Sequence, residues 1–478
     1  MKTSYVSTSI PYVNARPHVG FALELVQADV IARWRRLQDN DTFFLTGTDE
    51  NAFKNVQAAA SEGLPTGQLC DRNAAVFRDL ARALNISHDA FIRSSSDAHF
   101  RGASRFWLAC RKEDIVLRQY RGLYCVGCED FYLKRDLADG RCPVHGVVPE
   151  NVEETNYFFR LSAYQKPLET LIASGKLRIL PETRRNEALG FIRQGLQDFS
   201  ISRNRERSGG WGVPVPGDAS QVMYVWFDAL TNYLTGPGYG SNVDNFERYW
   251  RKCANSIHVI GKDILKFHAI YWPAMLLSAG LPLPGTIFVH GHLTVEGRKI
   301  GKSQGNTVDP FPLIRRFGAD ALRYYLLRAV RSGEDGDVSV ARLRELYNSD
   351  LANGLGNLAR RLEALCGRSG CGPPDTRDTH VPADVSGALD RFDFAGALRA
   401  IWRRVDEINR DIDAARPWEL LNDQKAESLS EHLSAWIGAV LDVSRVLRPF
   451  LPGTAHRIES GFTKSRLQKS QPLFPRLT

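Results

Sequence analysis

The sequence lacks an uninterrupted apolar stretch long enough to cross a bilayer, so no transmembrane helix is expected. Residues 1–14 also lack the basic segment and apolar run of a secretory signal. Neither an internal repeat nor a low-complexity tract is present. A chain of 478 residues is too long for one ordinary domain. We therefore expect a cytoplasmic protein of roughly two to four globular domains.

Cysteine is also scarce, with eight residues in the whole chain, and a disulfide framework is not expected. Three of the cysteines and one histidine form two pairs, each with two residues between its members: Cys125 with Cys128, and Cys142 with His145. Two short turns of this kind can present four ligands to one tetrahedral Zn²⁺. No position is left for water, so the sequence predicts a structural zinc site. The alternative is three unrelated thiols and a surface imidazole.

The charge balance is mildly basic, with a formal net charge of +8 and a pI of about 9.0. This favours a polyanionic partner, although a basic surface that binds nothing explains the same excess. Hydrophobic residues make up 43% and charged residues 24%, which is typical of a globular protein with large cores.

The N-terminal third alternates short apolar strands with amphipathic helices. Residues 4–10 and 42–46 are predicted strands, and residues 21–37 between them form a predicted helix. Strand, loop, helix and strand in this order begin a doubly wound α/β sheet. The Cys-rich stretch 117–146 interrupts the pattern. Further α/β elements follow at 222–233, 256–279 and 286–289, and residues 338–449 are mostly helical in pattern.

Two separate segments have the chemistry to bind nucleotide phosphates. Pro17-His18-Val19-Gly20 lies between the first predicted strand and its helix, where Gly20 permits close approach and His18 can donate to a phosphate. Downstream, Lys299-Ile-Gly-Lys302-Ser303 places two lysines on a polar loop that can close over a triphosphate. Taken singly, each segment has an ordinary explanation. The first can be a histidine with a structural role, and the second can be a charged turn in solvent.

Taken together, the two segments resemble the two signatures of class I aminoacyl-tRNA synthetases, HIGH and KMSKS. Further blocks resemble the methionyl-tRNA synthetases in particular. They are Pro11-Tyr-Val-Asn14, Thr46-Gly-Thr-Asp-Glu50, Ser200-Ile-Ser-Arg203, Tyr224-Val-Trp-Phe-Asp-Ala229, Gly261-Lys-Asp-Ile264, Phe267-His268, Trp272-Pro273, Arg416-Pro-Trp-Glu-Leu420 and Pro472-Leu-Phe-Pro475. The resemblance spans essentially the whole chain.

This resemblance implies the fold and its domains. We expect a Rossmann-like catalytic domain at 1–115 and 222–335, split by a connective insert with a zinc knuckle at 116–221. An α-helical domain of the anticodon-binding type is expected at 336–478. Because the chain ends after this bundle, without a further tRNA-binding or dimerisation module, a monomer is expected.

The resemblance also implies roles for individual residues. The catalytic residues would be His18, Lys299 and Lys302, and Gly20 and Ser303 would join them in binding ATP, which carries Mg²⁺. Asp49 would hold the amino acid's α-ammonium group, and His268 or Tyr12 could offer the sulfur of methionine a weak donor. The predicted amino-acid pocket is Ile10, Tyr12, Trp226, Ala229, Tyr233, Phe267, His268 and Trp272. Aromatic rings suit a thioether, although they also suit an ordinary core.

The implied reaction is ATP-dependent formation of methionyl-adenylate, followed by transfer of the methionyl group to the 3′ end of methionine tRNA. Asn357 and Arg361 lie four residues apart on one predicted helix face, and Trp418 could stack on an anticodon base. Ordinary packing of Trp418 and a solvated Arg361 are the alternative.

Three departures from the family pattern keep other functions open. Phe21 replaces the second histidine of the first signature, Asn51-Ala52 replaces His-Gly, and Gly301 replaces a serine of the second signature. Losing one charge-stabilising donor can cost roughly 10²–10³ in rate. One alternative is therefore a biosynthetic paralogue that passes an adenylated amino acid to a small molecule. The other is a tRNA-binding protein without catalytic activity.

Overall fold

The computed structural model describes the chain except residues 126–129, 133, 144–145, 296, 300–306, 370–380, 423–425, 464–470 and 478. It forms two compact units. Unit 1 contains Met1–Ala28, Arg35–Leu80 and Ser87–His290, and unit 2 contains Asp29–Trp34, Ala81–Ile86 and Gly291–Thr478. Among the described helices, none has the length and apolar character needed to span a membrane.

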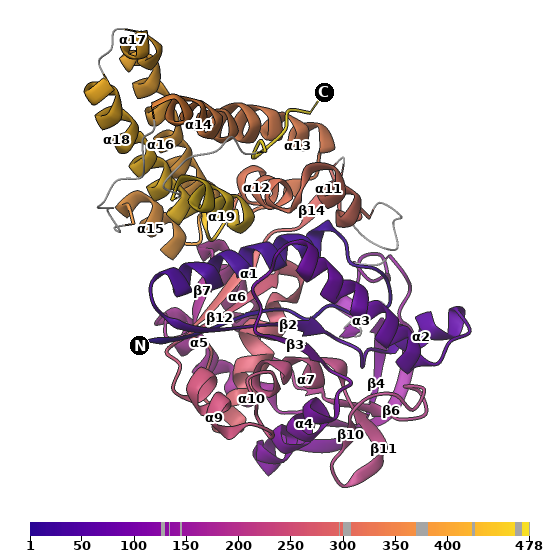
Figure 1. Cartoon of the computed structure of the whole chain (residues 1–478). Coiled ribbons are helices and arrows are strands. Elements are labelled where there is room, and N and C mark those ends of the chain that lie inside the picture. The colour runs from indigo at the N-terminus through magenta and orange to yellow at the C-terminus, as the bar shows by residue number, and fades with distance from the viewer. Residues whose placement is uncertain are drawn as a thin grey trace. The chain divides into compact units, whose positions relative to one another are not determined.

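Unit 1 is built on a parallel six-stranded sheet, of which β2, β3, β7 and β12 are labelled in Figure 1. The strand order is β3-β2-β1-β12-β13-β7. Its strands are β1 (Thr3–Thr8), β2 (Asp41–Thr48), β3 (Ala90–Arg93), β7 (Arg178–Leu180), β12 (Asn255–Gly261) and β13 (Thr286–His290). Strands β1 and β12 are buried almost throughout, as expected for a parallel sheet covered on both faces. The predicted α/β class and the strands predicted at 4–10, 42–46 and 286–289 are confirmed.

The chain order of the strands reverses between β1 and β12, which are neighbours although β1 is followed in sequence by β2. In open α/β sheets, a crevice forms at such a switch point beyond the carboxyl ends of the strands. Helix α1 (Val19–Leu37) follows β1, and η5 (Lys262–Ile264), π-helix η6 (Phe267–Tyr271) and α10 (Trp272–Ser278) follow β12. The loops after β1, β2 and β12 therefore meet at one edge of the sheet.

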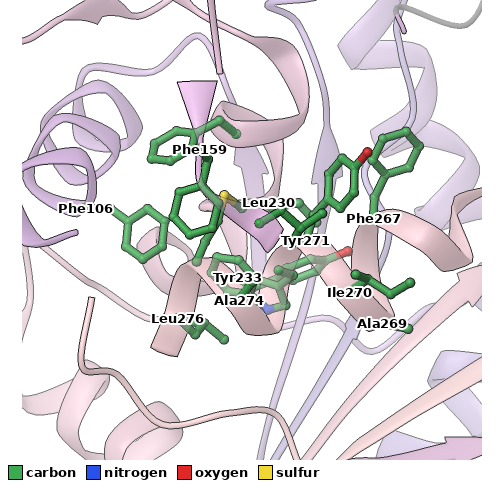
Figure 2. Close-up of a cluster of buried hydrophobic side chains, with 14 of the residues drawn as sticks. Phe106, Phe159, Leu230, Tyr233, Phe267, Ala269, Ile270, Tyr271, Ala274 and Leu276 are labelled. Carbon is green, nitrogen blue, oxygen red and sulfur yellow. The ribbon is translucent and has the colours of Figure 1, made fainter. Parts of the chain in front are cut away.

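Other helices of unit 1 contribute buried aliphatic and aromatic side chains to its core. They are α2 (Phe53–Ser61), α3 (Thr66–Ala83), α4 (Asp97–Ala109), α5 (Gln165–Ala173), α6 (Glu182–Arg193), α7 (Val225–Leu230), α8 (Asn232–Thr235) and α9 (Val243–Phe246). Figure 2 shows part of the core, in which Tyr233 lies among apolar side chains such as Leu230 and Ala274. The ring of Phe106 in this core lies 5.6 Å from that of Trp272, centroid to centroid. The core thus fixes α7, α8 and η6, the elements that carry the predicted pocket.

Two smaller antiparallel sheets occupy the middle of the chain. One has the order β5-β4-β6-β8 and is dominated by the long pair β4 (Ile115–Cys125) and β6 (Glu150–Phe159), with β5 (Asp130–Tyr132) and β8 (Phe199–Ser200). The other contains β9 (Ser202–Asn204), β10 (Pro214–Val215) and β11 (Asp218–Met223). The stretch that interrupts the α/β pattern is therefore a β module.

Unit 2 is mainly helical after a small sheet of β14 (Leu293–Val295), β15 (Arg298–Lys299) and β16 (Gly336–Asp337). Its helices are α11 (Pro310–Phe317), α12 (Ala319–Ala329), α13 (Val340–Leu346), α14 (Asn357–Ser369), α15 (Ala383–Asp390), α16 (Phe394–Ala415), α17 (Pro417–Asn422), α18 (Ala426–Leu447) and α19 (Pro452–Phe462). The helical pattern predicted for this region is confirmed.

One predicted helical run is not a regular α-helix. A π-helical segment, η8 (Tyr347–Gly356), separates α13 from α14. A Cβ added at Gly356 would lie 2.9 Å from the carbonyl oxygen of Leu351. The residue without a side chain therefore permits the wide turn, which the apolar periodicity of the sequence does not reveal.

A buried ion pair lies within unit 2. Arg323 of α12 is fully buried, and its guanidinium lies 2.8 Å from the buried carboxylate of Asp29. The same side chain donates to the backbone carbonyls of Leu84, Pro449 and Phe450 at 2.7–3.1 Å. One side chain therefore joins four separate segments of the chain.

Candidate active site

The loops after β1 and β2 are held together at the carboxyl edge of the parallel sheet. Tyr12 and Asp49 form an isolated parallel bridge, in which the Asp49 amide donates to the Pro11 carbonyl at 2.9 Å. This brings two of the residues predicted for the amino-acid pocket side by side, although they lie in separate motifs of the sequence.

The carboxylate of Asp49 is oriented by its own loop. Its Oδ1 accepts from the backbone N–H of Asn51 at 3.2 Å and from the Ser94 hydroxyl at 3.3 Å. The next residue, Glu50, is held by a bidentate pair with Arg93, at 2.7 and 2.9 Å. A carboxylate fixed in this way is suited to receive a primary ammonium group.

Helices α7, α8 and α10 and the π-helix η6 bring the predicted aromatic residues together. Trp226 and Phe267 stack face to face, with ring centroids 3.7 Å apart and an interplanar angle of 4°. Tyr233 lies 6.0 Å from Trp272, centroid to centroid. Ala229 lies on α7 with Trp226, and Ile10 follows the end of β1. Because the first two rings are in direct contact, a thioether would contact their edges rather than enter between their faces.

The side chain of His268 is fixed at both ring nitrogens. Nδ1 lies 2.9 Å from the carbonyl oxygen of Ile264, which can only accept, so Nδ1 carries a proton. Burial lowers the pKa of His268 to about 4, which keeps the ring neutral. Nε2 therefore accepts from the Tyr233 hydroxyl, 2.7 Å away. The prediction that His268 offers the sulfur a donor is wrong for this arrangement, because neither nitrogen retains an N–H for it.

A pH dependence of stability follows from two buried imidazoles. Burial lowers the pKa of His268 to about 4 and that of His258 well below its ordinary value, the latter further lowered by His268. In the unfolded chain both rings titrate near the ordinary value of about 6.5. As the pH falls from about 6.5 to about 4, the unfolded state binds protons that the folded state does not, so stability decreases.

The replacement of His268 by Gln should therefore reduce this pH dependence. Each pKa unit corresponds to about 1.4 kcal/mol, so His268 contributes about 2 kcal/mol of the loss between neutral pH and about pH 5. This loss of stability is measured from the urea unfolding midpoints of the wild type and H268Q at about pH 7.5 and about pH 5. An equal loss in both proteins would contradict the assignment.

The first signature lies at the start of α1. The backbone N–H of Gly20 donates to His18 Nδ1 at 3.1 Å, so in the neutral ring the proton is on Nε2. A Cβ added at Gly20 would lie 2.8 Å from His18 Cε1, which explains why glycine is needed beside this imidazole. The chain thus presents an imidazole donor at a helix N-terminus, as a phosphate-binding role requires.

Two of the departures from the family pattern have simple structural explanations. Phe21 is buried and packs edge to face on Phe77 of α3, with ring centroids 5.4 Å apart. Ala52 has φ of −69°, an extended conformation that needs no glycine. The first substitution therefore adds to the core, and the second causes no backbone strain.

Several site residues have no counterpart among the sequence predictions. Glu24 of α1 accepts from the Ser9 amide and hydroxyl, both at 2.7 Å, and lies 2.9 Å from His290 Nε2. The carboxamide of Asn51 contacts Asp228 at 2.6 Å, and Asp228 lies 2.6 Å from His99 Nε2. In the sequence, these residues are single polar side chains among apolar neighbours, which is only a weak indication that they face inward. Nothing in the sequence indicates which of them are in contact with one another.

The second signature falls mostly outside the described residues. Lys302 and Ser303 belong to the undescribed stretch, as does Gly301. The backbone of Lys299 ends strand β15, where it pairs with Thr294 of β14. The roles of these residues stay predictions.

Two of the four predicted zinc ligands are described. Cys125 ends strand β4 and Cys142 begins a turn in which the Gly146 amide donates to the Cys142 carbonyl at 2.8 Å. Both thiols are buried, at 1% exposure each, although Arg141 and Pro143 beside Cys142 are exposed. Cys128 and His145 lie outside the described residues. Among the described side chains, no group of three or more metal-ligating residues occurs.

The residues predicted for the anticodon lie on helices of unit 2. Asn357 begins α14 and is exposed, and Arg361 on the same helix pairs with Asp413 near the end of α16, at 2.5 Å. Trp418, on α17, is 48% exposed, so the alternative of a buried packing residue is wrong. Arg361 is paired, but its side chain is 25% exposed and that of Asp413 is 65% exposed, so the pair is in contact with solvent.

The chain is similar to known proteins over its whole length. The family model of class I tRNA synthetases (M) matches residues 4–147 and 133–363. A methionine--tRNA ligase of Synechocystis sp. is 42% identical, covering 98% of this chain and 92% of the relative. A methionine--tRNA ligase of Brucella suis is also 42% identical, covering 95% and 90%.

Solved structures give the same result. Mycobacterium tuberculosis methionyl-tRNA synthetase in complex with methionyl-adenylate is 39% identical, with a TM-score of 0.91 and full coverage of both chains. Its apo form is 37% identical, with a TM-score of 0.84 over 100% of this chain and 99% of that chain. By sequence, fold and signature residues, this chain belongs to the methionyl-tRNA synthetase family of class I tRNA synthetases.

Proposed function

We propose that this chain is a methionine--tRNA ligase, which activates L-methionine with ATP and transfers it to methionine tRNA. The observation that carries the proposal is the arrangement around the switch point of the sheet. The fixed carboxylate of Asp49 and the aromatic group of Trp226 and Tyr233 lie in the same unit as the His18 imidazole. Family membership assigns these groups to the amino acid and to ATP. It favours a tRNA ligase over a biosynthetic paralogue.

The chemistry requires positioning rather than a covalent nucleophile. A methionine carboxylate oxygen attacks the α-phosphorus of ATP, and the bond to the pyrophosphate oxygen breaks. Asp49 holds the α-ammonium group, and the aromatic residues hold the side chain. The His18 Nε2–H donates to a phosphate oxygen on which charge increases in the transition state. Lys299 and Lys302 are assigned to the leaving pyrophosphate, and Mg²⁺ accompanies the ATP.

A structural zinc ion belongs to this proposal. Two buried thiols in a small β module suit Zn²⁺, because such a module has little core of its own and thiolates are preferred ligands. Cys125, Cys128, Cys142 and His145 would hold the ion, which would fix the turns of the module.

Loss of one thiolate should release this ion. We expect about one zinc per wild-type chain and less than about a tenth of that in Cys142→Ser, since a structural site needs all four ligands. Metal analysis of the purified proteins measures it, with Cys366→Ser as a matched buried-thiol control outside the module. Full zinc content in C142S would contradict the assignment.

Recognition of tRNA is assigned to unit 2. The exposed ring of Trp418 can stack on an unpaired base, and the ion pair of Arg361 with Asp413 fixes α14 against the end of α16, close in sequence to that ring. Asn357 lies one helical turn before Arg361. The net charge of +8 supports association with a polyanion. We also propose that the protein is a cytoplasmic monomer, because the family resemblance implies this.

Exchange of labelled pyrophosphate into ATP, measured with each standard amino acid and with norleucine, tests the activation step. We expect exchange with L-methionine well above that with leucine, isoleucine or norleucine. Exchange with a different amino acid as the best substrate would overturn the assignment. Absence of exchange from folded, zinc-loaded protein would also overturn it.

A further inference from the structure

A buried polar network lies behind the loop that carries Asp49. It begins at Asn51, whose carboxamide nitrogen donates to the Ser94 carbonyl at 2.9 Å and to Asp228 Oδ2 at 2.6 Å. The other carboxylate oxygen of Asp228 accepts from His99 Nε2 at 2.6 Å. His99 Nδ1 contacts the Thr235 hydroxyl at 2.8 Å. We call these residues the Asn51 network.

The network is largely buried and belongs to one unit. Asp228 and His99 have no exposed surface, and Asn51 is 9% exposed. All of its members lie within unit 1. Inside such a core, removal of one partner leaves a buried polar group unsatisfied, so the contacts have a strong influence on geometry.

The network connects two halves of the amino-acid site. At one end, the backbone N–H of Asn51 donates to the Asp49 carboxylate. At the other, Asp228 lies on α7 between Trp226 and Ala229, and Thr235 ends α8, which carries Tyr233. The group assigned to the ammonium and the helices assigned to the side chain are thus joined by hydrogen bonds.

We propose that Asn51 is a positioning residue for recognition of the substrate's α-ammonium group. Both N–H bonds of its carboxamide are used, one on Ser94 and one on Asp228, and this fixes the peptide whose N–H orients the Asp49 carboxylate. Asn51 stands where the family pattern has histidine, so the chain forms this connection with an amide. The inference rests on the proposed function, because that function assigns the ammonium to Asp49.

The test compares two ligands that differ only in the amino group, L-methioninol and 4-(methylthio)butan-1-ol. Dissociation constants are measured with the full zinc-loaded chain for the wild type, Asn51→Ala and the isosteric Asn51→Asp. Both variants should raise the dissociation constant of L-methioninol by about tenfold or more, because the charged hydrogen bond to its ammonium group is no longer oriented. Binding of 4-(methylthio)butan-1-ol should change less than about twofold.

A control variant separates this effect from the general loss of a buried amide. Asn156 of β6 is fully buried, and its amide donates to Glu154 at 2.9 Å, outside the network. Asn156→Ala should leave the ratio of the two dissociation constants at the wild-type value. The inference would be overturned if the Asn51 variants weakened the binding of both ligands equally. It would also be overturned if they changed the binding of neither ligand. A wild-type protein that binds neither ligand would overturn the proposed function and the inference with it.

Discussion

Replacement of His18 by Ala is expected to lower kcat for methionine-dependent pyrophosphate exchange by about 10²–10³, the usual effect of removing one donor to a developing charge. The Gly20 amide donates to Nδ1, so in the neutral ring the proton is on Nε2, and we assign this Nε2–H to phosphate. Because the imidazole is assigned to phosphate and not to the amino acid, the KM for methionine should change by less than about threefold.

A pair of amide substitutions tests which nitrogen of His18 acts. The amide nitrogen of Gln can take a place near that of Nε2, whereas the amide of Asn lies nearer to Nδ1. We therefore expect His18→Gln to recover about tenfold of the loss and His18→Asn to recover little. Wild-type kcat in His18→Ala would show that the imidazole has only a structural role.

Replacement of Asp29 by Ala is expected to reduce the free energy of unfolding of unit 2 by about 3–5 kcal/mol, because a buried guanidinium loses its counter-ion. Burial already lowers the pKa of Arg323, which shows the cost of keeping this charge in the core. Arg33, four residues after Asp29, contacts the same carboxylate at 2.8 Å and would lose this contact as well. Urea unfolding of the full chain, followed by circular dichroism, measures the change.

Two further variants define the cause. The double variant Asp29→Leu with Arg323→Met removes both charges together. Its free energy of unfolding should be much closer to that of the wild type than the value for Asp29→Ala is. Arg342→Ala, which breaks the exposed pair with Glu345, should cost less than about 1 kcal/mol. Equal effects of Asp29→Ala and Arg342→Ala would contradict the role of burial.

The sequence was sufficient to predict the elements with strong local patterns. The helix predicted at residues 21–37 is α1, because its apolar residues recur with helical period and Pro17 precedes it. The family blocks of the sequence assign Tyr12, Asp49 and Trp226 to one pocket, and the structure brings the backbones of Tyr12 and Asp49 into contact.

The long-range polar contacts could not be predicted, for a physical reason. Asn51 and Asp228 are 177 residues apart and His99 and Asp228 are 129 apart, and none of them belongs to a periodic pattern. The same holds for Arg323 and Asp29, which are far apart in the sequence and form a buried ion pair at 2.8 Å. Their burial is decided by packing, which a single sequence does not encode locally.

The most direct test of the central claim is charging of initiator and elongator methionine tRNA transcripts by the purified chain, with labelled methionine and Mg²⁺·ATP. We expect charging of both transcripts, and loss of most of the charging when Trp418 is replaced by Ala, since the exposed ring of Trp418 is assigned to the anticodon. Methionine-dependent exchange without charging of either transcript would contradict the assignment of a methionine--tRNA ligase and identify an enzyme that passes its adenylate to another acceptor.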